Sequence, residues 1–269
     1  MAFPDRQTLD LDHGRISYRQ AGSGPDLVLL HGLAGNSRTW EEQIEAFSGS
    51  WRVTAWDAPG YGLSDTVAPT VDAYAATLAA LVDALDLPTF VLLGHSMGGV
   101  VAGRFAGTYP GRLRALALSC TLLGRRQPAG TPLSEPYLAR LTELETLPAR
   151  EYGARRAKSM AAPGCAPEII ERLAGIAAET RREGLAEAMR LIAEADNTDA
   201  LAALSIPVLV LTGEEDRTVT PDLSGALLDA LARGSARVRT AVLPRVGHAP
   251  YLEDTAAYNA ALKSFLDGL

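Results

Sequence analysis

Short, almost entirely apolar runs alternate along this chain with longer segments that have the periodicity of helices. The runs Leu27–Leu30 and Phe90–Leu93 are bounded by glycine and proline, which predicts short buried strands. Between them, apolar residues recur at helical spacing from Tyr74 onward, behind Thr70, a residue type that often caps a helix. Strands that are apolar on both faces are typical of a parallel sheet covered by helices on each side. The alternation therefore predicts an α/β fold with a mostly parallel sheet, whose other expected strands are Val53–Trp56, Leu113–Leu118, Pro207–Leu211 and Val238–Leu243.

Two stretches of the chain depart from this alternation. The first, Thr8–Arg19, alternates only weakly between apolar and polar residues, and we expect it to form an antiparallel ribbon at the edge of the sheet. The second, residues 121–204, contains no strand-like run but has apolar stripes at helical spacing. We therefore expect residues 1–120 and 205–269 to form one core, with residues 121–204 as a helical insertion between two of its strands.

The composition excludes several classes of protein. With 269 residues, 47% hydrophobic and 21% charged side chains, the chain has the make-up of an ordinary globular protein rather than of a disordered or collagenous one. Its net charge of -7 argues against a nucleic-acid partner, which would require a basic surface. No apolar run approaches the length of about 18 residues that a membrane span needs, and no basic start leads into an apolar run that would indicate a secretory signal. Two cysteines, Cys120 and Cys165, are too few for a disulfide framework and fit a cytoplasmic protein with reduced thiols.

Adjacent arginines recur in the inserted segment, although its overall charge is close to balanced. The pairs are Arg125–Arg126, Arg155–Arg156 and Arg181–Arg182. Such pairs could bind a carboxylate, or they could lie on solvated helix faces among the neighbouring glutamates. The interleaved charges favour the solvated face.

A serine directly follows one of the expected strands, in the sequence Gly94-His95-Ser96-Met97-Gly98, and it opens a segment able to form a helix. A G-x-S-x-G pattern at a strand–turn–helix junction forces a sharp turn that pushes the serine hydroxyl above the C-terminal edge of the sheet. The two glycines leave room for this turn, since a Cβ at either position would crowd the neighbouring backbone. Ser96 is therefore the candidate nucleophile.

A serine hydroxyl needs a base to accept its proton, and the base needs an acid to orient it. Of the four histidines, only His248 follows Ser96 in the chain, on a loop after an expected strand. The loop after another late strand carries three acids in a row, of which Asp216 lies deepest and is the preferred acid, with Glu215 as the alternative. A second place that sometimes supplies this acid, after the strand before the insertion, holds only Ser119, Cys120 and Thr121.

The negative charge that develops on an attacked carbonyl oxygen is best stabilised by backbone N–H groups. One candidate is the N–H of Met97, directly after the nucleophile at the start of a helix, where the helix dipole adds to the effect. The other is the N–H of Leu33, in the loop after the first buried strand.

Other residues of these loops have structural interpretations. We expect Asp57 and Ser64 to organise the turn in which they lie, and His31 to orient its own loop. On the helix after Ser96, Gly99, Gly103 and Gly107 are expected to allow close packing against the sheet.

Five motifs occur in the same order as in a known family. They are His31-Gly32-Leu33, Asp57-Ala58-Pro59-Gly60-Tyr61-Gly62-Leu63-Ser64, Gly94-His95-Ser96-Met97-Gly98, Gly213-Glu214-Glu215-Asp216 and Gly247-His248-Ala249-Pro250. With them the chain resembles the α/β-hydrolases over residues 1–120 and 205–269. The resemblance implies an eight-stranded sheet with an antiparallel second strand, a Ser-Asp-His triad and a helical cap at the place of the insertion. Family members with an aspartate nucleophile, the haloalkane dehalogenases and epoxide hydrolases, are disfavoured because position 96 is serine.

Within this family the chain is most similar to 3-oxoadipate enol-lactonases and related small carboxylesterases. The resemblance lies in the His-Gly-Leu stretch followed by a tryptophan-containing helix and in the tail Gly-His-Ala-Pro-Tyr-Leu-Glu. Hydrolases of carbon–carbon bonds usually carry tryptophan after the catalytic histidine and Gly-Pro-Gly after the early His-Gly. This chain has Ala249 and Ala34-Gly35-Asn36 at those places, which counts against that subfamily.

The resulting prediction is a serine hydrolase that cleaves a small carboxylic ester or lactone through an acyl-enzyme on Ser96, with no cofactor and no metal. Two alternatives stay open. One is hydrolysis of a carbon–carbon bond in a vinylogous diketone, and the other is a small-ligand receptor or stress regulator built on the same fold. The sequence does not determine the oligomeric state.

Overall fold

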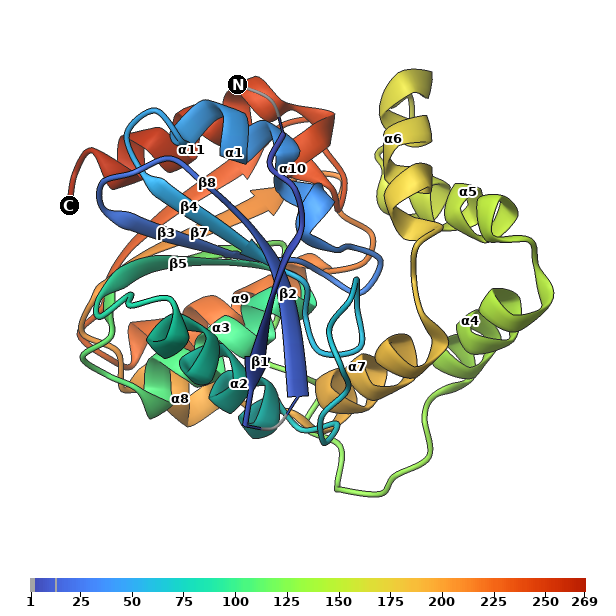
Figure 1. Ribbon diagram of the computed structural model, residues 1–269, viewed down its shortest axis with the longest axis horizontal. Coiled ribbons are helices and arrows are strands. Elements are labelled where there is room, and N and C mark those ends of the chain that lie inside the picture. Colours follow the sequence, from blue (N-terminus) through green and yellow to red (C-terminus); the bar gives the residue numbers. More distant parts are fainter. Residues whose placement is uncertain (1–2, 13) are drawn as a thin grey trace.

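An eight-stranded sheet forms the centre of the computed structural model, which describes residues 3–12 and 14–269 (Figure 1). Met1, Ala2 and His13 lie outside the described residues, so the beginning of the chain, where a secretory signal was not expected, is described only in part. The strand order across the sheet is β1-β2-β4-β3-β5-β6-β7-β8. The strands are β1 (Gln7–Leu11), β2 (Gly14–Ala21), β3 (Asp26–Leu30), β4 (Arg52–Trp56), β5 (Phe90–His95), β6 (Leu113–Ser119), β7 (Pro207–Gly213) and β8 (Arg237–Leu243).

The strand directions confirm the predicted sheet. β2 pairs antiparallel with both β1 and β4, whereas every other neighbouring pair is parallel. The described residues of the weakly alternating segment Thr8–Arg19 thus belong to the antiparallel ribbon at the sheet edge, as expected. Because β3, β5, β6 and β7 are parallel, their carboxyl ends meet at one edge, and the loops that follow them can share a site.

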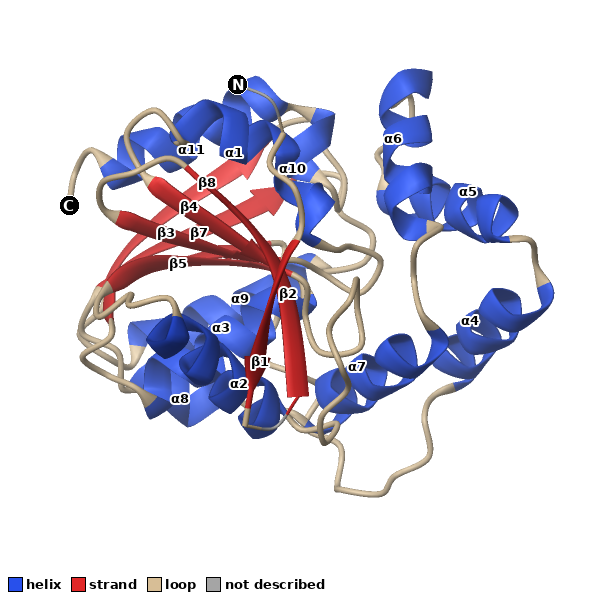
Figure 2. Cartoon of the chain, viewed as in Figure 1, coloured by secondary structure: helices blue, strands red, loops and turns tan. Residues whose placement is uncertain are grey.

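Helices cover both faces of the sheet (Figure 2). On one face lie α1 (Glu41–Phe47), with the short helix η1 (Ser37–Trp40) before it, α10 (Pro250–Glu253) and α11 (Thr255–Leu266). On the other lie α2 (Val71–Ala84), α3 (Met97–Thr108), α8 (Thr198–Ala202) and α9 (Pro221–Ala232). α2 begins where its sequence predicts, because the Thr70 side chain accepts a hydrogen bond from the N–H of Ala73.

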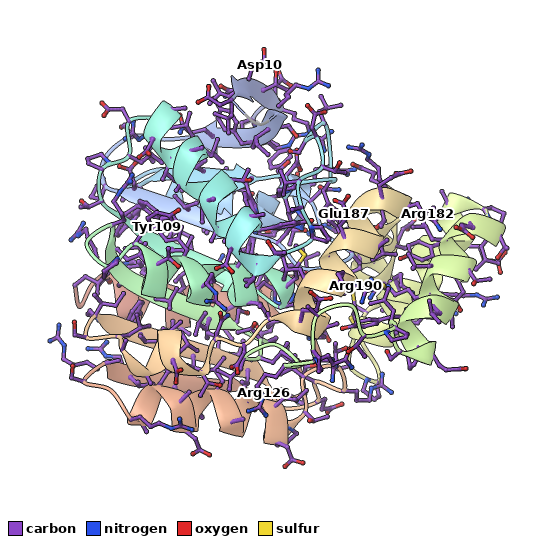
Figure 3. All side chains as sticks on the ribbon, turned by 90° about the horizontal axis from the view of Figure 1, so that it is seen from below. Asp10, Tyr109, Arg126, Arg182, Glu187 and Arg190 are labelled. Carbon is purple, nitrogen blue, oxygen red and sulfur yellow. The ribbon has the colours of Figure 1, made fainter. Side chains whose placement is uncertain are left out.

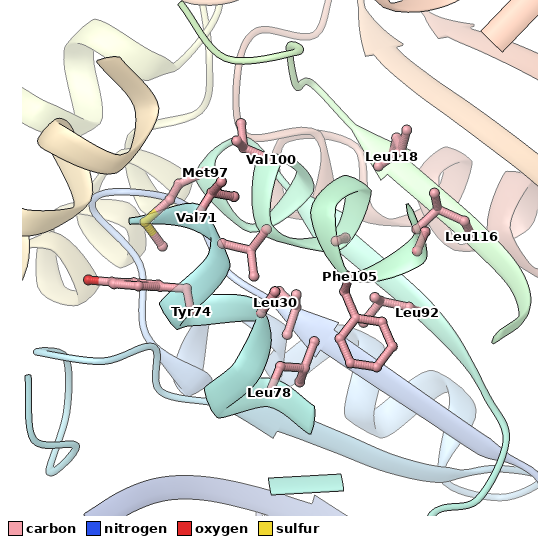
Figure 4. Packing of buried hydrophobic residues seen from close by; sticks show 14 of the residues in the cluster. Leu30, Val71, Tyr74, Leu78, Leu92, Met97, Val100, Phe105, Leu116 and Leu118 are labelled. Atoms are coloured by element: carbon pink, nitrogen blue, oxygen red, sulfur yellow. The ribbon is translucent and has the colours of Figure 1, made fainter. Parts of the chain in front are cut away.

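Successive residues of the central strands face opposite sides of the sheet, and each side has its own apolar core. Leu30 and Leu92 pack with α2 and α3 on one side, around Phe105 (Figure 4). Their neighbours Leu29 and Leu93 pack with α1 and α11 on the other side. This double burial explains why the strands read as continuous apolar runs rather than as alternating ones.

Of the three glycines of α3 expected to pack on the sheet, Gly99 lies against Thr121, just after β6, because a Cβ on it would lie 2.5 Å from the Thr121 Cβ. The other two pack elsewhere. A Cβ built on Gly107 would lie 2.7 Å from the Cβ of Ala200, and one on Gly103 would lie 3.1 Å from the Asn197 side chain. Gly103 and Gly107 therefore face α8 and the residues before it, not the sheet. The expectation was wrong because the sequence pattern of α3 does not show which neighbouring helix lies beside its small residues.

Between β6 and β7 the chain is helical, as predicted, and four of its helices lie to one side of the sheet (Figure 1). They are α4 (Glu135–Thr146), α5 (Ala149–Met160), α6 (Pro167–Ala177) and α7 (Arg182–Glu194). α5 packs on α6 and α4 packs on α7. α7 connects the inserted helices to the sheet core. Its Ala188 packs in the apolar core that contains α2 and α3, whereas its Met189 packs with Tyr152 of α5. In Figure 3, Glu187 and Arg190 are labelled on this helix.

The exact division at residues 120/121 and 204/205 stays a prediction, and α8, the last helix of the insertion, packs against α3 and α9 of the core. Among the described residues, no helix combines the length and the apolar character needed to cross a bilayer.

Candidate active site

Ser96 occupies the turn between β5 and α3 with a backbone conformation that side chains rarely adopt. Its φ is 53° and its ψ is -118°. Such a strained backbone conformation costs about 1–3 kcal/mol and is typical of functional sites. The neighbouring glycines are required here, because a Cβ on Gly94 would lie 2.3 Å from the carbonyl oxygen of Gly98. The Thr121 hydroxyl, two residues after β6, donates a hydrogen bond of 2.6 Å to the carbonyl oxygen of Ser96 and helps to hold the turn.

The structure brings Ser96, His248 and Asp216 together in one hydrogen-bonded chain. Nε2 of His248 lies 3.0 Å from the Ser96 Oγ, and Nδ1 lies 2.8 Å from Oδ2 of Asp216. All three residues are buried, with 8%, 4% and 8% of their surface exposed for Ser96, His248 and Asp216. In this arrangement a histidine could accept the proton of a serine hydroxyl while a carboxylate orients its ring.

The carboxylate of Asp216 is held in its ionised form by its surroundings. Burial raises the pKa of Asp216, but hydrogen bonds from His248 and from the N–H groups of Thr218 and Val219 outweigh burial, so the pKa lies below the ordinary value of an aspartate. The two N–H groups donate to Oδ1 at 2.8 and 3.0 Å, which leaves Oδ2 for the histidine.

The alternative acid, Glu215, is not brought to the histidine. Its backbone N–H donates to the carbonyl oxygen of Val246, and its carboxylate has no hydrogen-bond partner among the described residues. The geometry therefore favours Asp216 over Glu215 as the partner of His248.

The two residues whose backbone N–H groups were expected at the oxyanion site both lie beside Ser96, the candidate nucleophile. Met97 is the first residue of α3, and Leu33 lines the same cavity as Ser96. A Cβ on Gly32, directly before Leu33, would lie 3.0 Å from the Cβ of Ser96, so this loop touches the nucleophile turn. Neither N–H group donates a hydrogen bond within the described residues, and both are thus free to bind an oxygen of a substrate.

The carboxylate of Glu253 contacts the backbone around His248, which the sequence did not predict. Its Oε1 accepts a hydrogen bond from the N–H of Ala249, and its Oε2 accepts one from Gly247, so that it holds the residues on both sides of His248. Oε2 also accepts from the N–H of Ala162, just after α5. The tail Gly-His-Ala-Pro-Tyr-Leu-Glu was the only signal in the sequence, and it contained the glutamate without indicating a role.

The loop after β4 is organised as predicted. The Ser64 hydroxyl donates to the carbonyl oxygen of Asp57, and Oδ1 of Asp57 accepts from the N–H of Ser37 in the loop after β3. Nε2 of His31 accepts a hydrogen bond from the N–H of Ala58, and its Nδ1 donates to the carbonyl oxygen of Gly32, the residue directly before Leu33. These bonds require His31 to be neutral.

One group of three potential metal ligands occurs in the described part of the chain: Cys120, Asp216 and His248, whose ligand atoms lie within 4.8 Å of one another. Asp216 and His248 are already hydrogen-bonded to each other. Burial, followed by the nearby charge of Asp216, raises the pKa of the Cys120 thiol well above its usual value, which disfavours the thiolate that metals bind.

A cavity of about 330 Å³ opens above Ser96 and His248. The core contributes the loop around Leu33, and the inserted helices contribute Tyr137 of α4 and Met160 of α5. The N–H of His248 donates to the carbonyl oxygen of Met160 at 2.7 Å, so the end of α5 is bonded directly to the histidine loop. A small ligand bound here would contact the nucleophile and the insertion at the same time.

The fold and this arrangement define a class of protein, and the chain belongs to the α/β-hydrolase family. Residues 27–261 match the family described as "Alpha/beta hydrolase family".

The individual relatives include esterases and a lactonase. The chain is similar to 3-oxoadipate enol-lactonase 2 of Acinetobacter baylyi, with 28% identity over 98% of this chain and 97% of the relative. It is 32% identical to a pimeloyl-[acyl-carrier protein] methyl ester esterase of Aeromonas hydrophila, over 93% of this chain and 99% of the relative. Among solved structures it is similar to a thermophilic esterase from Thermogutta terrifontis in a malate-bound form, with 29% identity, a TM-score of 0.83 and 98% of each chain covered.

Proposed function

We propose that this chain is a carboxylic ester hydrolase that cleaves a small ester or lactone through an acyl-enzyme on Ser96. The observation that carries the proposal is the hydrogen-bonded chain Ser96–His248–Asp216 at the floor of the cavity. The relatives named as esterases and as an enol-lactonase support the same class of reaction.

In this mechanism His248 accepts the proton of Ser96 as Oγ attacks the carbonyl carbon. Asp216 keeps the imidazole oriented and stabilises its protonated form, for which its ionised carboxylate is suited. The histidine then gives the proton to the leaving alkoxide, so that the alcohol departs and the acyl group stays on Ser96. A water molecule, activated by the same histidine, attacks the acyl-enzyme and releases the acid. In a lactone the leaving alkoxide and the acyl group are parts of one molecule, which the same steps open to a hydroxy acid.

The N–H groups of Leu33 and Met97 would bind the carbonyl oxygen as it becomes negative. Donors that are fixed before the reaction need no rearrangement when the charge appears, and one such donor contributes on the order of 10²–10³ in rate. The helical insertion would act as a cap whose α4 and α5 close the cavity over the substrate. The two free cysteines, Cys120 and Cys165, support a cytoplasmic location. The proposed partner is the small-molecule substrate.

The test is steady-state hydrolysis of short p-nitrophenyl esters and simple lactones by the wild-type protein and by Ser96→Ala. We expect multiple turnovers from the wild type and a loss of at least about 10³-fold in kcat for the variant. Wild-type turnover by Ser96→Ala would overturn the mechanism.

The same samples separate the other two hypotheses. Bleaching of a coloured ring-cleavage product without ester hydrolysis would indicate that the protein cleaves a carbon–carbon bond instead of an ester. A ligand-induced rise in the melting temperature without multiple turnover would indicate a receptor.

A further inference from the structure

Glu179 lies at the corner between α6 and α7, where the insertion meets loops of the core. Its Oε2 accepts a hydrogen bond of 3.2 Å from Nδ2 of Asn36, in the loop after β3, and its Oε1 accepts one from Arg38 of η1. Nη2 of Arg6, just before β1, lies 3.6 Å from the same Oε2. One side chain of the insertion therefore contacts two segments of the core, and one of these segments carries Leu33.

The corner between α6 and α7 is also held against the core without Glu179. Nη1 of Arg181 donates a hydrogen bond of 2.8 Å to the carbonyl oxygen of Ser64, in the loop after β4. The backbone of Gly184 in α7 packs directly on the same loop, because a Cβ built on Gly60 would lie 2.4 Å from the Cα of Gly184. A substitution at Glu179 therefore removes its own bonds and leaves these other attachments of the corner in place.

Asn36 is the residue through which Glu179 reaches the loop after β3. It is almost completely buried, with 2% of its surface exposed. Its Oδ1 accepts from the N–H of Arg38 and caps η1, which leaves Nδ2 to donate to Glu179. Among the described residues this NH₂ group has no other hydrogen-bond partner. A buried donor without an acceptor is costly, and turning the amide to find another acceptor would break the cap on η1.

The loop that ends at Asn36 is short and tightly turned. Leu33 comes only three residues before Asn36, and between them the N–H of Gly35 donates to the carbonyl oxygen of Gly32 at 3.0 Å. The position of the Leu33 N–H therefore depends on where Asn36 is held. A donor at an oxyanion site is effective only when it is aimed correctly before the reaction begins.

We propose that Glu179 is a positioning residue for the oxyanion site, because its bond to Asn36 fixes the loop that presents the N–H of Leu33. The helical insertion thereby sets the geometry of a group in the core. The Glu179 side chain is 36% exposed, and exposed ion pairs add little to stability, so its effect is expected in this geometry rather than in the stability of the fold. The inference rests on the proposed function, which gives the N–H of Leu33 its role.

The test compares Glu179→Ala with Glu179→Gln on a short p-nitrophenyl ester. Alanine removes the acceptor for Asn36, whereas glutamine retains an oxygen that can accept from it. We expect Glu179→Ala to lower kcat by about tenfold or more and to change KM by less than about twofold, because an oxyanion donor acts on the transition state. Glu179→Gln should stay within about threefold of the wild-type kcat. An unchanged kcat in Glu179→Ala, or equal losses in the two variants, would overturn the proposal.

Glu42→Ala is the matched control. Glu42 of α1 also forms an ion pair between the core and the insertion, since its Oε1 lies 2.6 Å from Nη1 of Arg172 in α6. Within the described structure it forms no hydrogen bond or ion pair with residues 31–36. We expect this variant to change kcat by less than about twofold. Equal losses in Glu42→Ala and Glu179→Ala would mean that only the attachment of the insertion matters, which would overturn the positioning role.

Amide hydrogen exchange, measured by mass spectrometry, keeps this inference separate from the chemistry. Faster exchange of the peptide that contains residues 32–36 in Glu179→Ala, but not in Glu42→Ala, supports the positioning role even if no ester is turned over. The absence of turnover would then count against the proposed function alone. Unchanged exchange of this peptide in Glu179→Ala overturns the inference whatever the rates.

Discussion

The carboxylate of Glu253 holds His248 in place from both sides, because it accepts hydrogen bonds from the N–H groups of the residues before and after the histidine, Gly247 and Ala249. The same carboxylate bonds to Ala162 at the end of α5. Glu253 thus connects the position of the imidazole to the position of the helical insertion.

Glu253→Gln should lower kcat by about tenfold to a hundredfold with little change in KM, since small displacements of a catalytic group have effects of that size. The glutamine amide has only one acceptor oxygen, so its NH₂ group would face one of the backbone N–H groups that the carboxylate of Glu253 now accepts from. The matched control is Glu214→Gln, whose carboxylate accepts from the N–H of Arg245 in the same loop but not next to His248. Equal losses in the two variants would show that Glu253 has no special role in positioning the histidine.

Exchanging single acids at the end of β7 should separate the two candidates for the third member of the triad. We expect Asp216→Asn to lower kcat on the order of 10³–10⁴-fold, because an amide cannot stabilise the imidazolium. Glu215→Gln should stay within about twofold, since its carboxylate bonds to nothing in the described structure. Steady-state rates on one p-nitrophenyl ester measure both, and a larger loss from the glutamate change would reverse the assignment.

Gly107 and Gly175 should respond in opposite directions to alanine. A Cβ on Gly107 would lie 2.7 Å from the Cβ of Ala200, so Gly107→Ala must push α3 and α8 apart, and we expect it to lower the free energy of unfolding by about 1–3 kcal/mol. Nothing lies within 4 Å of a Cβ on Gly175 in α6, where alanine should stabilise the helix by about 0.5–1 kcal/mol. Urea unfolding of the two variants checks this contrast, which the same sign in both would contradict.

His31 should make the folded chain less stable in mild acid. Burial lowers the pKa of His31 to about 4, from an ordinary value of 6.5, and the neutral ring accepts a hydrogen bond at Nε2 from the N–H of Ala58. Between these two pKa values the unfolded chain binds a proton that the folded chain does not, so stability is lost as the pH falls from 6.5 towards 4. At pH about 5 the free energy of unfolding is about 2 kcal/mol lower than at neutral pH because of His31.

His31→Gln removes this titration and retains a carbonyl that can accept from Ala58. Between neutral pH and pH about 5, the free energy of unfolding of the variant should therefore fall by about 2 kcal/mol less than that of the wild type. Urea unfolding at each pH measures this difference. The same loss in both proteins would show that His31 does not titrate with a lowered pKa.

Much of the core could be predicted because its signals are local. β3, β5 and β7 are short and buried on both faces, so composition alone indicates them, and Gly94 and Gly98 around Ser96 follow from the sharpness of one turn. Chain order then leaves a single histidine after the nucleophile. These inferences need no knowledge of how distant segments pack.

The features that could not be predicted depend on distant contacts. Glu253 acts through backbone groups of two segments, one of them more than eighty residues earlier in the chain. Arg155 and Arg156 are adjacent, yet helical geometry turns one towards solvent and the other into the cavity. The favoured interpretation of the arginine pairs as solvated fits Arg155 and fails for Arg156, because only the packing of α5 over the core decides which face is covered.

Trapping of the acyl-enzyme tests directly whether Ser96 is the nucleophile. The protein is mixed rapidly with p-nitrophenyl acetate, quenched in acid within the first turnover, digested and analysed by mass spectrometry. We expect a burst of p-nitrophenol of about one equivalent and one acetyl group on the peptide that contains Ser96, with both absent in Ser96→Ala. An acetyl group on another residue such as Cys120, or turnover by Ser96→Ala with no acetylated peptide, would contradict it.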